Sequence, residues 1–205
     1  MKYDLFQHTF HEQKLITIDD ILVRFPDIDR KQLTRWVSQG RLIHPARWLY
    51  ILPHIRRDEV WMWECANMLV RPSYISLEYA LGIYAFIPEE VVTLTCITTQ
   101  KTQRYNLGQW WRYSYRSIIP RAFTEYRIYS TPRGKYLLAT PAKALIDFCY
   151  FHPDYIIPLD FEEMRLKSAE VLEKTTPDEL RQIAKIFKNK RLEIQIEALI
   201  SYLLS

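Results

Sequence analysis

The 205-residue sequence predicts an α+β protein. Short amphipathic segments with N-cap residues indicate helices before residue 40 and after residue 140, whereas β-branched and alternating segments at residues 91–139 indicate strands. The composition is that of a globular chain, because 48% of the residues are hydrophobic and 25% are charged. We therefore expect a helical N-terminal domain, followed by a second domain with a small antiparallel or mixed sheet and several helices.

The glycine content excludes several classes of enzyme. The chain contains four glycines: Gly40, Gly82, Gly108 and Gly134. Glycine-rich phosphate loops need two or three glycines within about eight residues, so that backbone amides can approach the anion. No two of these glycines are that close. The sequence therefore excludes a P-loop, a Rossmann fingerprint, a kinase-type glycine-rich loop and a G-x-S-x-G nucleophile elbow.

The residue spacing indicates no metal site, cofactor or catalytic site. Cys65, Cys96 and Cys149 form no C-x-x-C motif and have no histidine pair near them, so we expect reduced thiols in the core. The acidic pairs are adjacent residues that point to different faces, and the histidines lie at no nucleophile–base spacing. We predict a protein that has no cofactor and is not an enzyme.

No apolar run suggests a membrane or secretory segment. The chain begins Met1-Lys2-Tyr3-Asp4, without the apolar stretch of a signal peptide. No window approaches the run of about 18 apolar residues that a spanning helix needs. We predict a soluble, cytoplasmic protein with no membrane partner.

The net charge of +4 is concentrated in two basic segments. Residues 30–57 carry seven basic residues and no acidic residue, and residues 100–135 carry eight basic residues against a single acidic one, Glu125. Such segments are typical of proteins that bind polyanions. A solvated charged surface is the alternative interpretation.

The N-terminal segment predicts three short helices. A first amphipathic helix lies near residues 5–10. A capping-box pattern at Thr17 starts the second helix, which ends before Pro26. Asp29 can cap the third helix, and Gly40 supplies the left-handed residue that ends it. The second and third helices, joined by a short turn, form a helix-turn-helix pattern.

The third of these helices has an outer face without acidic residues. Leu33, Trp36 and Val37 form its apolar stripe. The opposite side carries Lys31, Thr34, Arg35, Ser38 and Gln39. Long cationic donors beside short hydroxyls suit a recognition helix in the major groove of DNA. An ordinary solvent-facing surface is the alternative, although such surfaces usually mix charge signs.

A predicted hairpin follows this helix. Two β-prone runs, residues 41–44 and 47–51, flank a turn at Pro45-Ala46. The hairpin completes a winged helix-turn-helix over residues 1–57, with a recognition helix near 30–39 and a wing near 41–51. The residues expected to contact DNA are Arg30, Lys31, Thr34, Arg35, Ser38, Arg41, Arg47, Arg56 and Arg57.

Residues 58–205 are expected to form the second domain. It begins with an apolar helix at 59–69 and a helix that Ser73 or Ser76 caps. The expected strands are 91–99, 110–116, 126–130 and 135–139, with turns at Asn106-Leu107-Gly108 and Pro132-Arg133-Gly134. The expected later helices start at Thr140-Pro141, span 161–174, start at Thr176 in a capping box, and run from Leu192 to Leu203.

The strand at 110–116 predicts a sheet with one apolar and one cationic face. Trp111, Tyr113 and Tyr115 alternate with Trp110 and the basic residues of the strand. The cationic face is a possible second nucleic-acid surface, because arginines interleaved with aromatic rings suit stacking on unpaired RNA bases. Its candidate residues are Lys101, Arg104, Arg112 and Arg116. Burial of the aromatic rings in the core is the competing interpretation.

Several runs of residues are distinctive. One is Arg71-Pro72-Ser73-Tyr74-Ile75-Ser76-Leu77-Glu78-Tyr79-Ala80-Leu81, followed by Phe86-Ile87-Pro88-Glu89. Others are the β-rich run Leu94 to Thr99 and Ala139-Thr140-Pro141-Ala142-Lys143-Ala144-Leu145-Ile146-Asp147. Together with Arg47-Trp48-Leu49-Tyr50, these runs resemble the AbiEi-type antitoxins, also described as AbiEi-type transcriptional regulators. The similarity covers residues 15–150 and departs from the family at Trp48, where relatives commonly have glycine.

The resemblance implies a bacterial antitoxin of type IV. In that family the winged helix binds inverted repeats in double-stranded DNA and represses its own operon, and the C-terminal domain carries the antitoxic activity without a stable complex with the toxin. The toxin is a nucleotidyltransferase, which in some relatives acts on tRNA. We therefore expect a DNA-binding autorepressor and antitoxin. An RNA-binding regulator that uses the cationic sheet face is the alternative.

Overall fold

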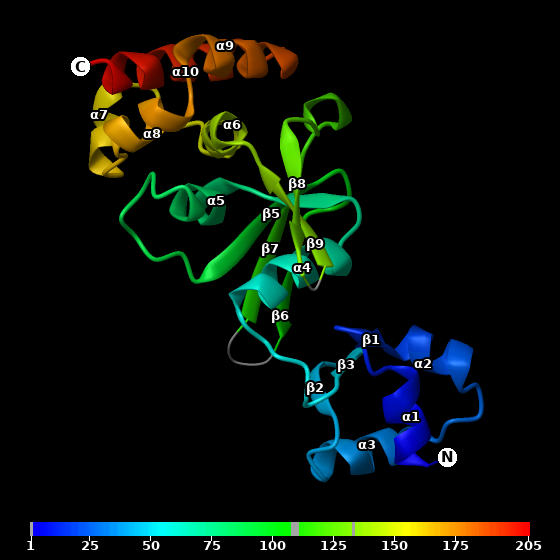
Figure 1. The fold of residues 1–205 in the computed structure, drawn as a ribbon. Coiled ribbons are helices and arrows are strands. Elements are labelled where there is room, and N and C mark those ends of the chain that lie inside the picture. Colours follow the sequence, from blue (N-terminus) through cyan, green and yellow to red (C-terminus); the bar gives the residue numbers. More distant parts are fainter. Residues whose placement is uncertain (1, 108–110, 133) are drawn as a thin grey trace. The chain divides into compact units, whose positions relative to one another are not determined.

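The computed structural model describes residues 2–107, 111–132 and 134–205 (Figure 1). The chain divides into two compact units, Met1–Cys65 with Asn106–Trp111 and Ala66–Tyr105 with Arg112–Ser205. Residues 58–65 thus cluster with the first unit, whereas the sequence pattern had placed them in the second domain. The fold is mixed α and β, as predicted, with sheets of three and six strands among the described residues.

The first unit contains the three predicted helices. They are α1 (Tyr3–Thr9), α2 (Ile18–Arg24) and α3 (Arg30–Ser38). The predicted capping box is present, since the Thr17 hydroxyl accepts from the Asp20 amide at 3.0 Å and the Thr17 amide donates to the Asp20 carboxylate at 2.8 Å. Their apolar faces meet in one core, formed by Phe6, Phe10, Ile16, Ile21, Leu33, Trp36, Leu42, Tyr50 and Leu52.

A three-stranded sheet of order β1-β3-β2 accompanies the helices. Its strands are β1 (Ile16–Thr17), β2 (Ile43–Ala46) and β3 (Leu49–Ile51). The predicted turn at Pro45-Ala46 is wrong, because both residues belong to β2 and the turn lies at Arg47 and Trp48. Ala46 pairs with Leu49, which leaves a two-residue loop. The sequence did not indicate β1, since two residues carry no periodic signal.

The second unit is built on a six-stranded sheet of order β6-β7-β5-β4-β9-β8. Its strands are β4 (Ser73–Ile75), β5 (Thr93–Thr98), β6 (Gln103–Leu107), β7 (Trp111–Ser117), β8 (Tyr126–Thr131) and β9 (Gly134–Ala139). β5 pairs in parallel with β7 and β4 with β9, whereas β4–β5 and β8–β9 are antiparallel. The sheet is therefore mixed, one of the two predicted possibilities. The turn predicted at Asn106-Leu107-Gly108 is wrong at its first two residues, which belong to β6, and Gly108 lies outside the described residues. Of the turn predicted at Pro132-Arg133-Gly134, Gly134 belongs to β9 and residue 133 lies outside the described residues.

Helices cover both faces of this sheet. The last residues of α4 (Glu59–Leu69) lie on one face, where Tyr115 of β7 donates to the Ala66 carbonyl at 2.6 Å. On the other face lie α5 (Leu77–Ile83) and α6 (Pro141–Phe151), and a short 3-10 turn spans Pro120–Ala122. The N-cap of α6 is as predicted, because Thr140 Oγ1 accepts from the Lys143 amide at 3.3 Å.

The C-terminal helices pack beyond α6 (Figure 1). They are α7 (Pro158–Glu163), α8 (Ser168–Lys174), α9 (Pro177–Ile186) and α10 (Lys190–Leu203). The single helix predicted at 161–174 is wrong. The chain breaks between α7 and α8, where Arg165 has a φ of +57° and Leu166 turns into the core. A left-handed residue ends a helix even where the apolar periodicity continues.

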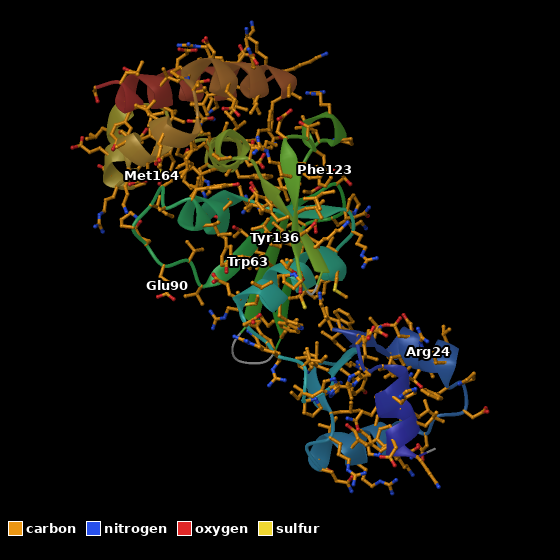
Figure 2. The ribbon with its side chains drawn as sticks, viewed as in Figure 1. Arg24, Trp63, Glu90, Phe123, Tyr136 and Met164 are labelled. Atoms are coloured by element: carbon orange, nitrogen blue, oxygen red, sulfur yellow. The ribbon has the colours of Figure 1, made fainter. Side chains whose placement is uncertain are left out.

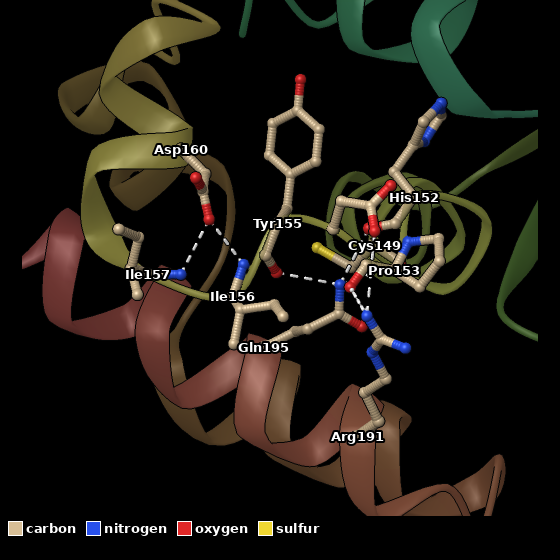
Figure 3. Close-up of polar contacts among 10 residues, drawn as sticks. Cys149, His152, Pro153, Tyr155, Ile156, Ile157, Asp160, Arg191 and Gln195 are labelled. Carbon is tan, nitrogen blue, oxygen red and sulfur yellow. Dashed lines mark hydrogen bonds and ion pairs between the residues drawn. The ribbon is translucent and has the colours of Figure 1, made fainter.

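One buried side chain of α10 holds the segment that leaves α6 (Figure 3). Gln195 Nε2 donates to the carbonyls of Cys149 at 3.2 Å, His152 at 2.9 Å and Tyr155 at 2.9 Å. Arg191 adds a hydrogen bond to the Pro153 carbonyl at 2.7 Å. These contacts tie α10 to the end of α6 and to the segment that follows it.

Candidate nucleic-acid interface

Both ends of α3 are fixed by the contacts predicted from the sequence. Asp29 Oδ1 accepts from the Lys31 amide at 2.9 Å and caps the N-terminus. Gly40 has a φ of +69°, and its amide donates to the Val37 carbonyl at 3.0 Å. The following amide donates to the Trp36 carbonyl at 2.8 Å, which completes a Schellman motif. These contacts define where α3 begins and ends.

The outer face of α3 is exposed as predicted. Leu33 and Trp36 are buried and Val37 packs against the core, which turns the opposite side to solvent. Ion pairs of this unit join Lys14 to Glu64 and Arg56 to Asp58, and among the described residues none on the outer face of α3 takes part in an ion pair. The exposed residues on it are Arg30, Lys31, Thr34, Arg35, Ser38 and Gln39.

The two hydroxyls of this face are oriented by the helix backbone. Ser38 Oγ donates to the Arg35 carbonyl at 2.8 Å, and Thr34 Oγ1 donates to the Arg30 carbonyl at 3.2 Å. With their hydrogens directed inward, both oxygens present lone pairs to solvent. They can accept from the exocyclic amino groups of adenine or cytosine, while the neighbouring cations can donate to guanine.

Arg41 is held at the C-terminal end of α3 by a residue that the sequence pattern did not single out. Tyr3 donates from its hydroxyl to the Arg41 carbonyl at 2.8 Å, and the Arg41 guanidinium lies 5.2 Å from the centre of the Tyr3 ring. The same ring makes an edge contact with Trp36 at 5.3 Å. No local spacing could have indicated this, because Tyr3 and Arg41 are 38 residues apart.

The hairpin turn adds a further exposed cation. Arg47 lies in the two-residue turn between β2 and β3 and is exposed. Burial raises the pKa of the Tyr50 phenol in β3, and the nearby Arg30 guanidinium opposes this rise.

Arg56 and Arg57 have partners of their own in the segment after β3. Arg56 forms an ion pair with Asp58 at 3.0 Å, and Arg57 donates to the carbonyls of Pro53 at 3.5 Å and Ile55 at 3.4 Å. Both side chains are exposed. The structure does not bring either of them into contact with the outer face of α3. The Asp58 carboxylate also offsets the charge that Arg56 could offer to a phosphate.

The second basic group is only partly available. Lys101, Arg104 and Arg112 are exposed on or beside β6 and β7. Arg116 is half-buried, with its guanidinium 4.8 Å from the centre of the Phe151 ring of α6. The predicted cationic face is therefore only partly present, because Arg116 packs against Phe151 of α6 while Arg112 stays exposed. Tyr113 and Tyr115 are buried, as the core interpretation required, and Trp110 is outside the described residues.

Side chains from two of the runs that resemble AbiEi-type antitoxins form a buried polar cluster. Tyr74 and Ser76 donate from their hydroxyls to Asp147 Oδ2 at 2.9 and 2.8 Å, and Lys143 forms an ion pair with the same carboxylate. Because the Ser76 hydroxyl is bonded to Asp147, it does not cap the N-terminus of α5. Lys143 and Asp147 have no exposed surface. The cluster holds β4 to α6 and offers no surface to a ligand.

The buried cysteines match the prediction of core thiols. Cys65, Cys96 and Cys149 are free and buried, and burial raises the pKa of each, to about 12 for Cys149. Among the described residues no group of three histidine, cysteine or acidic side chains could hold a metal ion. In the same part of the chain no helix has the length and apolar character needed to cross a bilayer.

Comparison with known proteins adds no identification. No model of a protein family matches this chain, and no curated protein matches it.

Proposed function

We propose that this protein is a sequence-specific DNA-binding repressor whose first unit acts as a winged helix. In this proposal α3 is the recognition helix in the major groove, and the β2–β3 hairpin is the wing. The observation that carries it is the exposed face of α3, which presents four donors or acceptors without an acidic residue: Lys31, Thr34, Arg35 and Ser38. Because this face has no acidic residue, the DNA phosphates do not repel it, and both its cationic groups and its hydroxyls can bond to base edges.

Two groups of residues have different roles in the proposal. Lys31, Thr34, Arg35 and Ser38 read base edges, because they lie at the centre of the exposed helix face. Arg30, Arg41 and Arg47 neutralise phosphates from the helix ends and the hairpin turn, with Arg56 and Arg57 as further candidates. Phosphate contacts set affinity for any sequence, whereas base contacts set preference.

The biological role proposed is that of a type IV antitoxin that represses its own operon. The resemblance of residues 71–81 and 139–147 to AbiEi-type antitoxins supports this role. The functional counterpart is then a nucleotidyltransferase toxin, neutralised without a stable complex. Co-expression of the chain with the nucleotidyltransferase of its own operon tests this role. Growth should be restored by the wild-type chain and by a variant that cannot bind DNA.

A mobility-shift titration on DNA from upstream of the gene tests DNA binding. Arg35→Ala should lower the preference for this DNA over scrambled DNA about fivefold or more, since a bidentate guanine contact contributes about 1–3 kcal/mol of discrimination. Arg47→Ala should weaken binding to both DNAs to a similar extent. Lys185→Ala, an exposed lysine of α9, is the control and should change neither. Equal binding of wild type to operator and scrambled DNA would contradict the repressor.

RNA binding through β6 and β7 is the second candidate. The observation that favours it is the exposure of Arg104 and Arg112 on the neighbouring strands β6 and β7, with exposed Lys101 just before β6. A filter-binding assay with tRNA tests it. Arg112→Ala should weaken binding severalfold, while Arg116→Ala should change it little because Arg116 packs on Phe151. If wild type and Arg112→Ala bind tRNA equally, this candidate is wrong.

A further inference from the structure

β8 is an edge strand of the six-stranded sheet. On one side it pairs with β9 in continuous register, from Tyr126 opposite Ala139 to Thr131 opposite Gly134. On its other side no strand of the described chain pairs with it. An edge of this length is a template for a further strand unless it is blocked.

The contacts of β9 show which backbone groups of β8 point outward. The Leu137 amide donates to Asn67 Oδ1 at 2.8 Å, and Asn67 Nδ2 donates to the Ser73 carbonyl of β4 at 2.9 Å. Leu137 therefore directs its amide away from β8. Opposite residues in an antiparallel pair exchange both hydrogen bonds or neither. Ile128, which is opposite Leu137, thus points its N–H and C=O away from β9.

Alternation along the strand extends this result. Tyr126 and Ser130 also present their backbone groups to the open side, whereas Arg127 and Tyr129 bond to β9. The side chain of Ile128 is 63% exposed in the middle of this edge. Arg127 is the one charged side chain of β8 and is exposed. Tyr129 stacks on Tyr136 of β9 with ring centres 5.3 Å apart, and Figure 2 labels Tyr136 on that strand.

We propose that β8 pairs with β8 of a second copy of this chain, antiparallel and with a two-fold axis at Ile128. Ile128 then exchanges both backbone hydrogen bonds with the partner's Ile128. Tyr126 and Ser130 exchange theirs with the partner's Ser130 and Tyr126. The two six-stranded sheets become one continuous sheet. The two-fold symmetry closes the assembly at two copies, so the edge is consumed and no fibre grows.

The direction of the backbone groups fixes this register. A two-fold axis can lie at any residue of the strand, because hydrogen-bonded and non-hydrogen-bonded pairs alternate along an antiparallel ladder. The axis at Ile128 pairs all three outward residues, Tyr126, Ile128 and Ser130, whereas an axis at any other residue of β8 leaves at least one of them unpaired. A shift by one residue would oppose inward-pointing groups and form no hydrogen bonds.

The side chains support self-pairing in this register. Ile128 meets the partner's Ile128, so two exposed apolar surfaces cover each other. Arg127 lies opposite the partner's Tyr129, a cation beside an aromatic ring, and no like charges lie directly opposite each other. The strand carries no acidic residue that would attract a basic strand of another protein. These features favour a second copy over an unrelated strand.

Cysteine cross-linking tests the register with matched neighbours. In the proposed dimer the Cα atoms at position 128 lie about 5.5 Å apart, within the disulfide range of about 4.4–6.8 Å. The Cα atoms at position 127 are offset by two residues and lie about 8 Å apart. Under mild oxidation, Ile128→Cys should form at least tenfold more covalent dimer than Arg127→Cys. The native cysteines are buried and should not interfere.

Val92→Cys supplies the background of random collisions. Val92 is 66% exposed and lies outside the sheet. Equal cross-linking at positions 92, 127 and 128 would overturn the proposal. So would a wild-type chain that sediments as a monomer at every concentration at which it stays dissolved.

Ile128→Pro gives a second, independent test by sedimentation. Proline removes the outward N–H of residue 128, and the ladder to β9 does not use that group. The dimer loses two central hydrogen bonds, so its Kd should rise at least tenfold. A Kd unchanged from wild type, with normal thermal unfolding of the variant, would overturn the proposal. Neither test involves nucleic acid, so a failure here leaves the proposed repressor function untouched.

Discussion

Among the described residues, Lys143 is the only lysine whose side chain is completely buried, and Asp147 balances its charge. Its carboxylate accepts from Tyr74 and Ser76 and is paired with Lys143, which also lies 4.6 Å from the centre of the Phe187 ring. Burial disfavours both charges, raising the pKa of Asp147 and lowering that of Lys143. The carboxylate has three partners, whereas the ammonium has one ionic partner. Substitutions of Asp147 and of Lys143 should therefore lower the free energy of unfolding by different amounts.

We expect Asp147→Ala to lower the free energy of unfolding by about 3–5 kcal/mol, because Lys143 is left charged and buried without a carboxylate. Lys143→Met should cost about half as much. Asp147 then keeps two hydroxyl donors and can take up a proton, which burial already favours. Urea unfolding of the two variants measures the difference. Equal losses would show that the hydroxyl donors contribute nothing.

Cys149 should make stability dependent on alkaline pH. Burial raises the pKa of its thiol from 9.0 to about 12. The folded chain holds this proton more tightly than the unfolded chain, so the stabilisation is complete below pH 9.0 and is lost as the pH rises toward 12. In that window this group lowers the free energy of unfolding by about 1.4 kcal/mol per pH unit.

Cys149→Ala should remove that part of the slope. Its cavity should lower stability by an amount that does not depend on pH. Denaturant unfolding across the same pH window separates the two effects. Since other buried thiols and phenols also have raised pKa values, a shallower slope should remain. An identical slope in wild type and variant would exclude Cys149 as a titrating group.

At the scale of the element, α3 depends on its last turn. Gly40 has a φ of +69°, and a Cβ added there would meet no atom within 4 Å. The cost of a side chain is therefore backbone strain alone. We expect Gly40→Ala to destabilise the chain by about 1 kcal/mol, and Gly40→Asn by less because asparagine tolerates the left-handed region. Thermal unfolding of both variants checks this order, which a steric clash would reverse since asparagine is larger.

The same element shows what local sequence could predict. The Asp29 cap, the left-handed Gly40 and the exposed face of α3 could be predicted from residues no more than four positions apart. The structure confirms all three. The hairpin turn lies two residues after the position that Pro45 indicates, because this proline belongs to β2. Proline is tolerated in an edge strand, where its missing N–H faces solvent.

At the scale of the whole molecule, the class of the fold was predictable and its pairing was not. The β-branched run of β5 identified a strand by itself. β4 was missed because its three residues lie in a run that was interpreted as a helix cap. The parallel pairing of β4 with β9 joins Ile75 to Leu138, which no local pattern connects. For the same reason the sequence could not show that Ser76 serves Asp147, or that α6 covers Arg116.

The salt dependence of DNA binding decides which basic segment of the whole chain meets phosphate. About six phosphate contacts would give a slope of log K against log salt near −5. Arg30, Arg41 and Arg47 replaced together by alanine should reduce the magnitude of that slope by about three, roughly one for each arginine removed. The matched triple variant at Lys101, Arg104 and Arg112 removes the same formal charge and should leave the slope unchanged. Mobility-shift titrations at several salt concentrations measure both slopes. If the second triple variant reduced the slope and the first did not, the interface would lie on β6 and β7, and α3 would not be the recognition helix.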